Sequence, residues 1–107
     1  MEFNKRLSNE PYQIITASGQ SIYYSKASGW VHALFDNVIE IPAGQWINLP
    51  VAIPDGYRPK MRVPFIAVYG ADVMIKGAIT TDGTISVYSN VATTNVSDVF
   101  FTISYPV

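Results

Sequence analysis

Short runs of aromatic and β-branched residues recur along the chain, and glycine-containing turns separate many of them. Such residues favour β-strands, and turns spaced roughly 8–12 residues apart are typical of sandwiches and barrels. Signals for helices are nearly absent. The pattern predicts an all-β chain of seven or eight strands, drawn from residues 11–16, 21–26, 30–35, 38–41, 45–49, 63–69, 73–80, 84–89 and 99–105.

Glycine and proline mark the connections between these runs. Ser18-Gly19 and Ser28-Gly29 predict turns, and Thr81-Asp82-Gly83 closes a hairpin. Pro42-Ala43-Gly44 predicts another hairpin, because proline presets φ and glycine supplies positive φ. Residues 49–64 hold four prolines, which lack the N–H of a sheet ladder. They predict an ordered crossover loop.

Several strands carry apolar residues on both faces. Residues 84–88 alternate cleanly between apolar and polar positions, whereas residues 63–69 are apolar on both faces. In the last strand one face is continuously apolar and Phe100 lies on the other. A two-layer domain of this size leaves the outer face of each sheet in water. We therefore predict that an oligomer covers the outward apolar side chains, which include Ile66, Val68 and Phe100.

Composition adds that the surface is poor in charge. Charged residues make up 14% of the 107 residues, against about 25% in typical soluble domains. From residue 63 onward the only charges are Asp72, Lys76, Asp82 and Asp98. A small monomer with so bare a surface risks association, so this half is predicted to meet other subunits. The alternative is a neutral surface rich in serine and threonine.

Length, charge and cysteine content exclude several classes. The length predicts one domain, and the net charge of −1 argues against a nucleic-acid-binding surface. No apolar run approaches the roughly 20 residues that span a bilayer, and residues 1–10 lack the apolar segment of a signal peptide. The absence of cysteine excludes disulfides and thiolate metal sites. We expect neither nucleic acid binding nor membrane insertion.

Patterns for catalysis and metal binding are sparse. His32 is the one histidine of the sequence, so a site of several histidines cannot form within one chain. No nucleophile-elbow motif accompanies the serines. A carboxylate pair for glycoside hydrolysis can be drawn from the acidic residues, but Asp55 and Asp82 adjoin glycines and are better explained as turn formers. We predict no enzymatic activity, no metal site and no cofactor.

Saccharide binding fits the residue inventory better. Sugar rings present apolar faces flanked by hydroxyls, so sites for them combine aromatic platforms with polar groups. The chain has seven tyrosines and two tryptophans, of which Trp46 follows a turn and is assigned to core packing. The candidate ligand-binding residues are Trp30, His32, Asp36, Tyr69, Asp72 and Tyr88.

Trp30 and His32 allow two interpretations. Alternate residues from 31 to 35 form an apolar inward face, so Trp30 and His32 face the other way. One interpretation packs this second face into a trimer interface. The other places Trp30 and His32 in a cleft between subunits, with Asp36 and Asp72 as acceptors for sugar hydroxyls.

Ordered motifs give the chain a resemblance to a known family. They are Ile22-Tyr23-Tyr24-Ser25-Lys26, Ile41-Pro42-Ala43-Gly44-Gln45-Trp46, Ile53-Pro54-Asp55-Gly56-Tyr57-Arg58-Pro59, Thr81-Asp82-Gly83-Thr84-Ile85-Ser86-Val87 and Ile103-Ser104-Tyr105-Pro106-Val107. Together they resemble the C-terminal receptor-binding domain of tail fibre and baseplate proteins from phages of Gram-positive bacteria. The resemblance covers roughly residues 19–107 and is most specific in the Pro-Asp-Gly-Tyr-Arg-Pro segment.

The resemblance implies a jelly-roll-like antiparallel β-sandwich that forms a homotrimer. Its function is then docking to a host cell-wall polysaccharide, teichoic acid or other surface saccharide, beside other tail or baseplate proteins. Such a protein is synthesised in the host cytoplasm and lies at the tail tip of the virion. Residues 19–107 are the receptor-binding domain, and residues 1–18 are the end of a shaft or linker with a first short strand. The alternative is a structural domain that trimerises and caps the fibre without contacting a receptor.

The most specific motif also has a physical interpretation. Gly56 is expected to adopt a backbone conformation closed to other residues, while Pro54 and Pro59 stiffen the loop. Tyr57 is expected to lie as a lid on the edge of the sheet with its hydroxyl on a partner. Arg58 is expected to pair with a carboxylate or a carbonyl. The motif is therefore predicted to be a structural corner.

Overall fold

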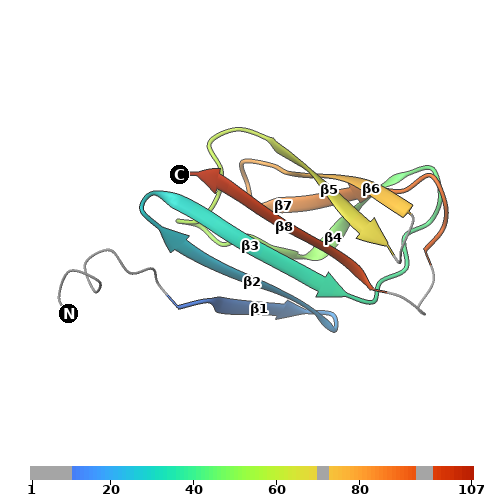
Figure 1. Cartoon of the computed structure of the whole chain (residues 1–107), viewed down its shortest axis with the longest axis horizontal. Helices are drawn as coiled ribbons and strands as arrows, with labels where there is room; N and C mark the ends of the chain where they lie inside the picture. Colours follow the sequence, from blue (N-terminus) through green and yellow to red (C-terminus); the bar gives the residue numbers. More distant parts are fainter. Residues whose placement is uncertain (1–10, 70–72, 94–97) are drawn as a thin grey trace.

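The computed structural model describes residues 11–69, 73–93 and 98–107. These residues form eight β-strands (Figure 1), and none of them belongs to a helix that could cross a membrane. In chain order the strands are β1 (Gln13–Ala17), β2 (Gln20–Ala27), β3 (Trp30–Asn37), β4 (Trp46–Ala52), β5 (Val63–Tyr69), β6 (Val73–Ile79), β7 (Thr84–Tyr88) and β8 (Val99–Pro106).

The strands form one antiparallel sheet in the order β1-β2-β3-β8-β5-β6-β7-β4. The sheet curls on itself so that β1 and β2 contact β4, which gives a nearly barrel-shaped fold (Figure 1). The prediction of an all-β antiparallel fold is confirmed.

The sheet is least continuous where its two halves meet. β8 pairs with β3 from end to end, but it pairs with β5 only at Val68–Phe100 and Tyr69–Val99. Pro64 lies in the part of β5 that does not pair with β8. Proline has no N–H to donate to a neighbouring strand, so Pro64 could not supply a donor to β8. Beyond Val68, β5 and β8 diverge.

Inward side chains from both halves fill the interior. In β8 the alternate residues from Val99 to Tyr105 are all buried, as predicted. Phe101 stacks on Phe65 of β5 with 4.0 Å between ring centroids, and on Phe35 of β3 with 5.2 Å. Where the hydrogen bonding between β5 and β8 ends, the packing of these three rings holds the two halves of the sheet together.

Apolar side chains also lie on the outer face, as the alternation predicted. Ile66 is 52% exposed and Phe100 is 46% exposed, while Val68 is half-buried. In the single chain these side chains meet solvent.

Residues 38–41 do not form the predicted strand, so the predicted hairpin at residues 42–44 is wrong. The Ile41 N–H instead donates to Thr93 Oγ1 at 2.7 Å, and the Ile41 carbonyl accepts from the Thr93 N–H at 3.0 Å. Ile39 and Ile41 are buried. The apolar residues of this run are thus used for the core, but the sequence could not identify their backbone partner in a distant loop.

β4 continues further than predicted, through Pro50 to Ala52. β4 is the last strand of the sheet order and has β7 as its one hydrogen-bonded neighbour. An edge strand tolerates proline because the missing N–H can face away from the ladder. The pairing with β7 is also irregular between Asn48 and Ala52. The crossover loop therefore covers residues 53–62 and not 49–64.

The Pro-Asp-Gly-Tyr-Arg-Pro segment forms the predicted structural corner. Gly56 has a φ of +92°, in the region that favours glycine. The Tyr57 N–H donates to the Pro54 carbonyl at 3.1 Å and closes the turn. Arg58 Nε donates to the Ile53 carbonyl at 3.0 Å, so the expected partner of Arg58 is a carbonyl.

Tyr57 closes the space between the corner and the first strands. Its hydroxyl accepts a hydrogen bond from Gln13 Nε2 at 3.0 Å, and its ring lies edge-on to Tyr24 at 4.8 Å between centroids. This is the predicted lid. β1 is thus held by β2 and by the corner, so the described part of residues 1–18 belongs to the same folded unit as residues 19–107.

Candidate functional site

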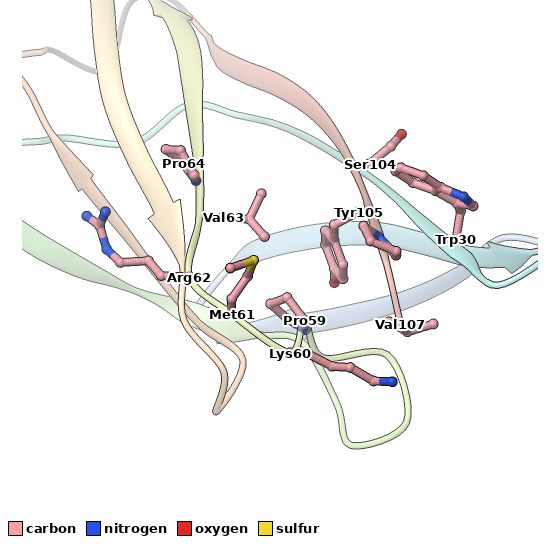
Figure 2. A pocket seen from close by; sticks show the side chains of 11 residues that line it. Trp30, Pro59, Lys60, Met61, Arg62, Val63, Pro64, Ser104, Tyr105 and Val107 are labelled. Atoms are coloured by element: carbon pink, nitrogen blue, oxygen red, sulfur yellow. The ribbon is translucent and has the colours of Figure 1, made fainter.

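A pocket of about 470 Å³ opens where β5 and β8 diverge (Figure 2). Its volume lies within the roughly 300–1,000 Å³ typical of small-ligand sites. The start of β3, the loop before β5 and the neighbouring ends of β5 and β8 enclose it. The lining residues are Trp30, Pro59, Lys60, Met61, Arg62, Val63, Pro64, Ser104, Tyr105, Pro106 and Val107.

Trp30 stands at the rim of this pocket and is 47% exposed. It begins β3 and pairs with Pro106 of β8. The Val107 N–H donates to the Gly29 carbonyl at 2.9 Å, which holds the last residues beside the turn before Trp30. Figure 2 shows Trp30 and Arg62 on opposite sides of the pocket. The indole is therefore supported on a strand and still offers an open face.

His32 lies beside the pocket and not in its lining. His32 Nδ1 is 2.7 Å from the Oγ of Ser104, its register partner on β8. Ser104 lines the pocket, and Figure 2 shows its hydroxyl directed away from Pro59 and Met61, so His32 holds the Ser104 side chain at the edge of the pocket. A Ser–His–Asp triad also needs a carboxylate to orient the histidine. Asp36, on the same strand and face, lies roughly 13 Å further along, too far for that role.

Two cations border the pocket on its loop side. Lys60 and Arg62 come from the loop before β5, and both are exposed. Neither an aspartate nor a glutamate is among the lining residues of this pocket. The Arg62 guanidinium carbon also lies 5.9 Å from the centre of the Trp46 ring. Arg62 therefore belongs both to the pocket and to a second aromatic group.

Tyr105 forms the inner wall of the pocket and is fixed there. Its side chain is buried, and its hydroxyl donates to the Tyr57 carbonyl at 2.6 Å. Burial raises the pKa of Tyr105 to about 12, so this hydroxyl remains a neutral donor at physiological pH. The bond ties β8 to the structural corner, which leads into the segment that carries Lys60 and Arg62.

The second aromatic group lies on the outer face of β4 and β7. Trp46 and Tyr88 are register partners with 5.6 Å between ring centroids. Lys76 of β6 places its Nζ 4.8 Å from the centre of the Tyr88 ring. Trp46 is 47% exposed, so its assignment to core packing is wrong. The following residue, Ile47, packs against the core in its place.

Asp36 is not brought to the pocket. It is six residues after Trp30 on the same strand, roughly 20 Å away in an extended chain, and it pairs with Phe100. Partial desolvation raises the pKa of Asp36 above its usual value, and a hydrogen bond and charge repulsion from Asp98 raise it further. The pairing of two carboxyl groups at this end of the sheet lies apart from the aromatic residues.

The remaining candidates are also separated from the pocket. Tyr69 packs against the core at the end of β5 that pairs with β8, away from the diverging end. Asp72 lies outside the described residues. Of the six candidates, Trp30 lines the pocket, His32 adjoins it through Ser104, and Tyr88 belongs to the second aromatic group.

Sequence reasoning missed the cations and prolines of the site. Lys60 and Arg62 stand with Arg58 in one proline-bounded segment, which was a usable signal for a local basic surface. Pro64 and Pro106 each lack a main-chain N–H, but only the fold brings the two together at the pocket. No sequence pattern predicts that Trp30 lies close in space to residues 59–64, about thirty positions later in the chain.

The arrangement suits binding of a ligand with hydroxyls and an apolar face. It offers an open indole, a fixed serine hydroxyl and two cations around an apolar hollow. Within the described ranges, no group of three or more His, Cys, Asp or Glu side chains is placed to hold a metal ion. A scan against protein-family models finds no match to this chain, and a search of curated proteins finds no matching relative.

Proposed function

We propose that this protein is a non-enzymatic saccharide-binding domain that serves as the receptor-binding tip of a phage tail fibre or baseplate protein. The observation that carries the proposal is the exposed Trp30 indole at the rim of a pocket bordered by Lys60 and Arg62. An indole face stacks on the apolar face of a sugar ring, and nearby donors reach its hydroxyls. The phage assignment rests on the ordered motifs of the sequence, from residue 22 to the last residue.

The proposal includes a homotrimer of jelly-roll-like sandwiches at the tail tip of the virion, beside other tail or baseplate proteins. The two halves of the curled sheet, β1-β2-β3-β8 and β5-β6-β7-β4, are then the two layers. Outward Ile66 and Phe100 support an assembly that shields them from water. Three sites on one fibre raise the avidity for a repetitive host surface, by about 10²–10⁴ in favourable geometry.

A glycan array probed with the intact protein tests saccharide binding, followed by titration of each glycan that binds. We expect Trp30→Ala to weaken binding about tenfold or more, because loss of a central aromatic contact costs more than about 1 kcal/mol. Val38→Ala is the control, since Val38 is an exposed apolar residue that lines neither of the two hollows. An array without any bound glycan, or equal losses in both variants, contradicts the proposal.

A second candidate function is a structural domain that trimerises and caps the fibre, with recognition left to another segment. A smaller hollow of about 280 Å³ favours it, lined by Tyr12, Tyr23 and Leu34. Tyr23 and Leu34 are register partners on the outer face of β2 and β3, and both are more than a third exposed. An apolar hollow of this kind suits contact with another subunit.

Adsorption to host cells separates the two functions, because both predict a trimer. Trp30→Ala that keeps the trimer and loses adsorption supports recognition by this domain. Unchanged adsorption of the same variant supports the capping function and contradicts the proposed one.

A further inference from the structure

Arg62 connects the Trp30 pocket to the exposed aromatic group on β4 and β7. It lines the pocket, and its guanidinium carbon lies 5.9 Å from the centre of the Trp46 ring. Figure 2 shows the Arg62 side chain directed away from Trp30. A guanidinium stacked over an indole keeps its N–H edge available for a carboxylate or phosphate. The two aromatic surfaces therefore share one cation.

The surface continues from Trp46 across the outer face of the sheet. Trp46 pairs with Tyr88 and Tyr88 pairs with Lys76, so the three side chains form one cross-strand row on β4, β7 and β6. The Lys76 Nζ lies over the Tyr88 ring at 4.8 Å from its centre. This row therefore places two neighbouring aromatic rings beside a cation, and the pocket likewise has an aromatic ring and cations.

The charged side chains of this surface all have one sign. Lys60 and Arg62 border the pocket, and Lys76 stands in the row beyond it. Neither the pocket lining nor the row of Trp46, Tyr88 and Lys76 contains an aspartate or a glutamate. Three cations of one sign beside stacking platforms complement a ligand with negative groups spaced along it.

We infer that the saccharide site extends from the Trp30 pocket across Arg62 to Trp46 and Tyr88, and that it takes several consecutive units of a negatively charged glycan. The inference rests on the proposed function and deepens it. One unit occupies the pocket against Trp30, an anionic group meets Arg62, and later units lie over Trp46 and Tyr88. A single unit is then expected to contact only one of the two aromatic surfaces.

The two tryptophans of the chain report the two ends of this site separately. Trp30→Phe leaves Trp46 as the sole indole, and Trp46→Phe leaves Trp30. Each variant is titrated with oligomers of one to six units, followed by tryptophan fluorescence. The probes are hyaluronan oligosaccharides, which carry carboxylates, glycerol-phosphate oligomers, which carry phosphates, and uncharged malto-oligosaccharides. The anionic series that binds identifies which anion the site accepts.

We expect the affinity of the parent protein for one anionic series to rise about tenfold from one unit to four, since tenfold corresponds to about 1.4 kcal/mol, within the range of one additional aromatic stacking contact. Trp46 fluorescence should respond only to the longer oligomers. Added salt should weaken their binding, because exposed charge pairs are screened. Arg62→Gln should reduce both the affinity and the salt dependence. Lys26→Gln should change neither, although Lys26 also lies over an aromatic ring, that of Tyr57.

The outcomes separate this inference from the proposed function. An array saccharide that binds through Trp30 without any response of Trp46, or binding independent of length and salt, overturns the extended anionic site and leaves the proposed function intact. Binding of the uncharged malto-oligosaccharides but of neither anionic series also overturns the extended anionic site and leaves the proposed function intact. A protein that binds no glycan on the array overturns both.

Discussion

Gly83 shows how one backbone position joins two parts of the fold. It follows Asp82 in the β6–β7 hairpin with a φ of +88°, and its carbonyl accepts the Ile53 N–H at 2.9 Å. A Cβ at this position would lie 2.2 Å from the Ile53 carbonyl oxygen and 2.9 Å from Arg58 Nε. Only glycine therefore allows the hairpin to approach the structural corner.

We predict that Gly83→Ala lowers the free energy of unfolding by about 2–4 kcal/mol, because it combines a left-handed backbone with a backbone clash. Gly44→Ala is the matched control, since Gly44 has a φ of +77° and no atom within 4 Å of an added Cβ. That variant should lose about 1 kcal/mol. Urea unfolding measures both, and equal losses contradict the role assigned to the close approach.

Tyr105 gives the stability a dependence on pH in the alkaline range. The tyrosine pKa is about 10 in an unfolded chain and about 12 in the folded protein. Between these values the unfolded chain releases the proton first, so the contribution is complete below about pH 10 and is lost as pH rises toward 12.

We expect Tyr105→Phe to cost about 1 kcal/mol at pH 7 through loss of the hydrogen bond to the Tyr57 carbonyl. The variant should then lose less additional stability than the parent between about pH 10 and 12. Guanidinium chloride unfolding at a series of pH values measures the two slopes. If the free energy of unfolding falls equally with pH in the parent and in the variant, burial does not raise the pKa of the Tyr105 hydroxyl.

At the scale of elements, β5 and β6 pack closely where the Phe65 ring of β5 lies over Gly77 of β6. Gly77 is the register partner of Phe65, and a Cβ on Gly77 would lie 2.2 Å from Phe65 Cζ. The other side of the Phe65 ring stacks on Phe101 at 4.0 Å between centroids. The ring therefore has no free space on either side.

Gly77→Ala is predicted to destabilise the fold by about 1–3 kcal/mol through overpacking. Adding Phe65→Leu should recover part of that loss, because the smaller side chain leaves room for the methyl group. A double-mutant cycle in urea measures the coupling. Strict additivity of the two changes contradicts the contact.

The elements also show where sequence reasoning stopped. The strand over residues 63–69 was predicted with the bounds that the structure has, because its β-branched and aromatic residues have well-marked ends. Because of Pro50, the strand predicted from residue 45 was expected to end at residue 49, whereas β4 ends at Ala52. The sequence does not reveal that β4 is an edge strand, where proline is tolerated. The exposure of Trp46 was missed for a related reason, because a short run can be placed in either of two registers.

At the scale of the whole molecule, apolar residues form a continuous row on the outer surface. Ile14 pairs with Tyr23 and Tyr23 pairs with Leu34, across β1, β2 and β3. All three are exposed in the single chain. A row of this kind favours association, because burying it removes apolar surface from water.

We predict that light scattering gives three times the chain mass of 11.8 kDa. Leu34→Glu should shift the mass toward one chain, since a charge at the centre of an interface is costly to bury. Trp30→Ala should keep the larger mass, because Trp30 stands at the pocket and apart from this row. A stable monomer of the parent protein at all concentrations contradicts the trimer.

The sequence by itself determined the strand-rich class, the inward residues of β8 and β7, and the glycine turns at residues 18–19, 28–29 and 81–83, because alternation and turn chemistry act between neighbours in the chain. Only the tertiary structure decided that β5 and β8 pair at one end and diverge at the other. That divergence brings Trp30, Arg62 and Ser104 around one pocket. Strand order and register depend on contacts between distant residues, and local patterns do not specify them.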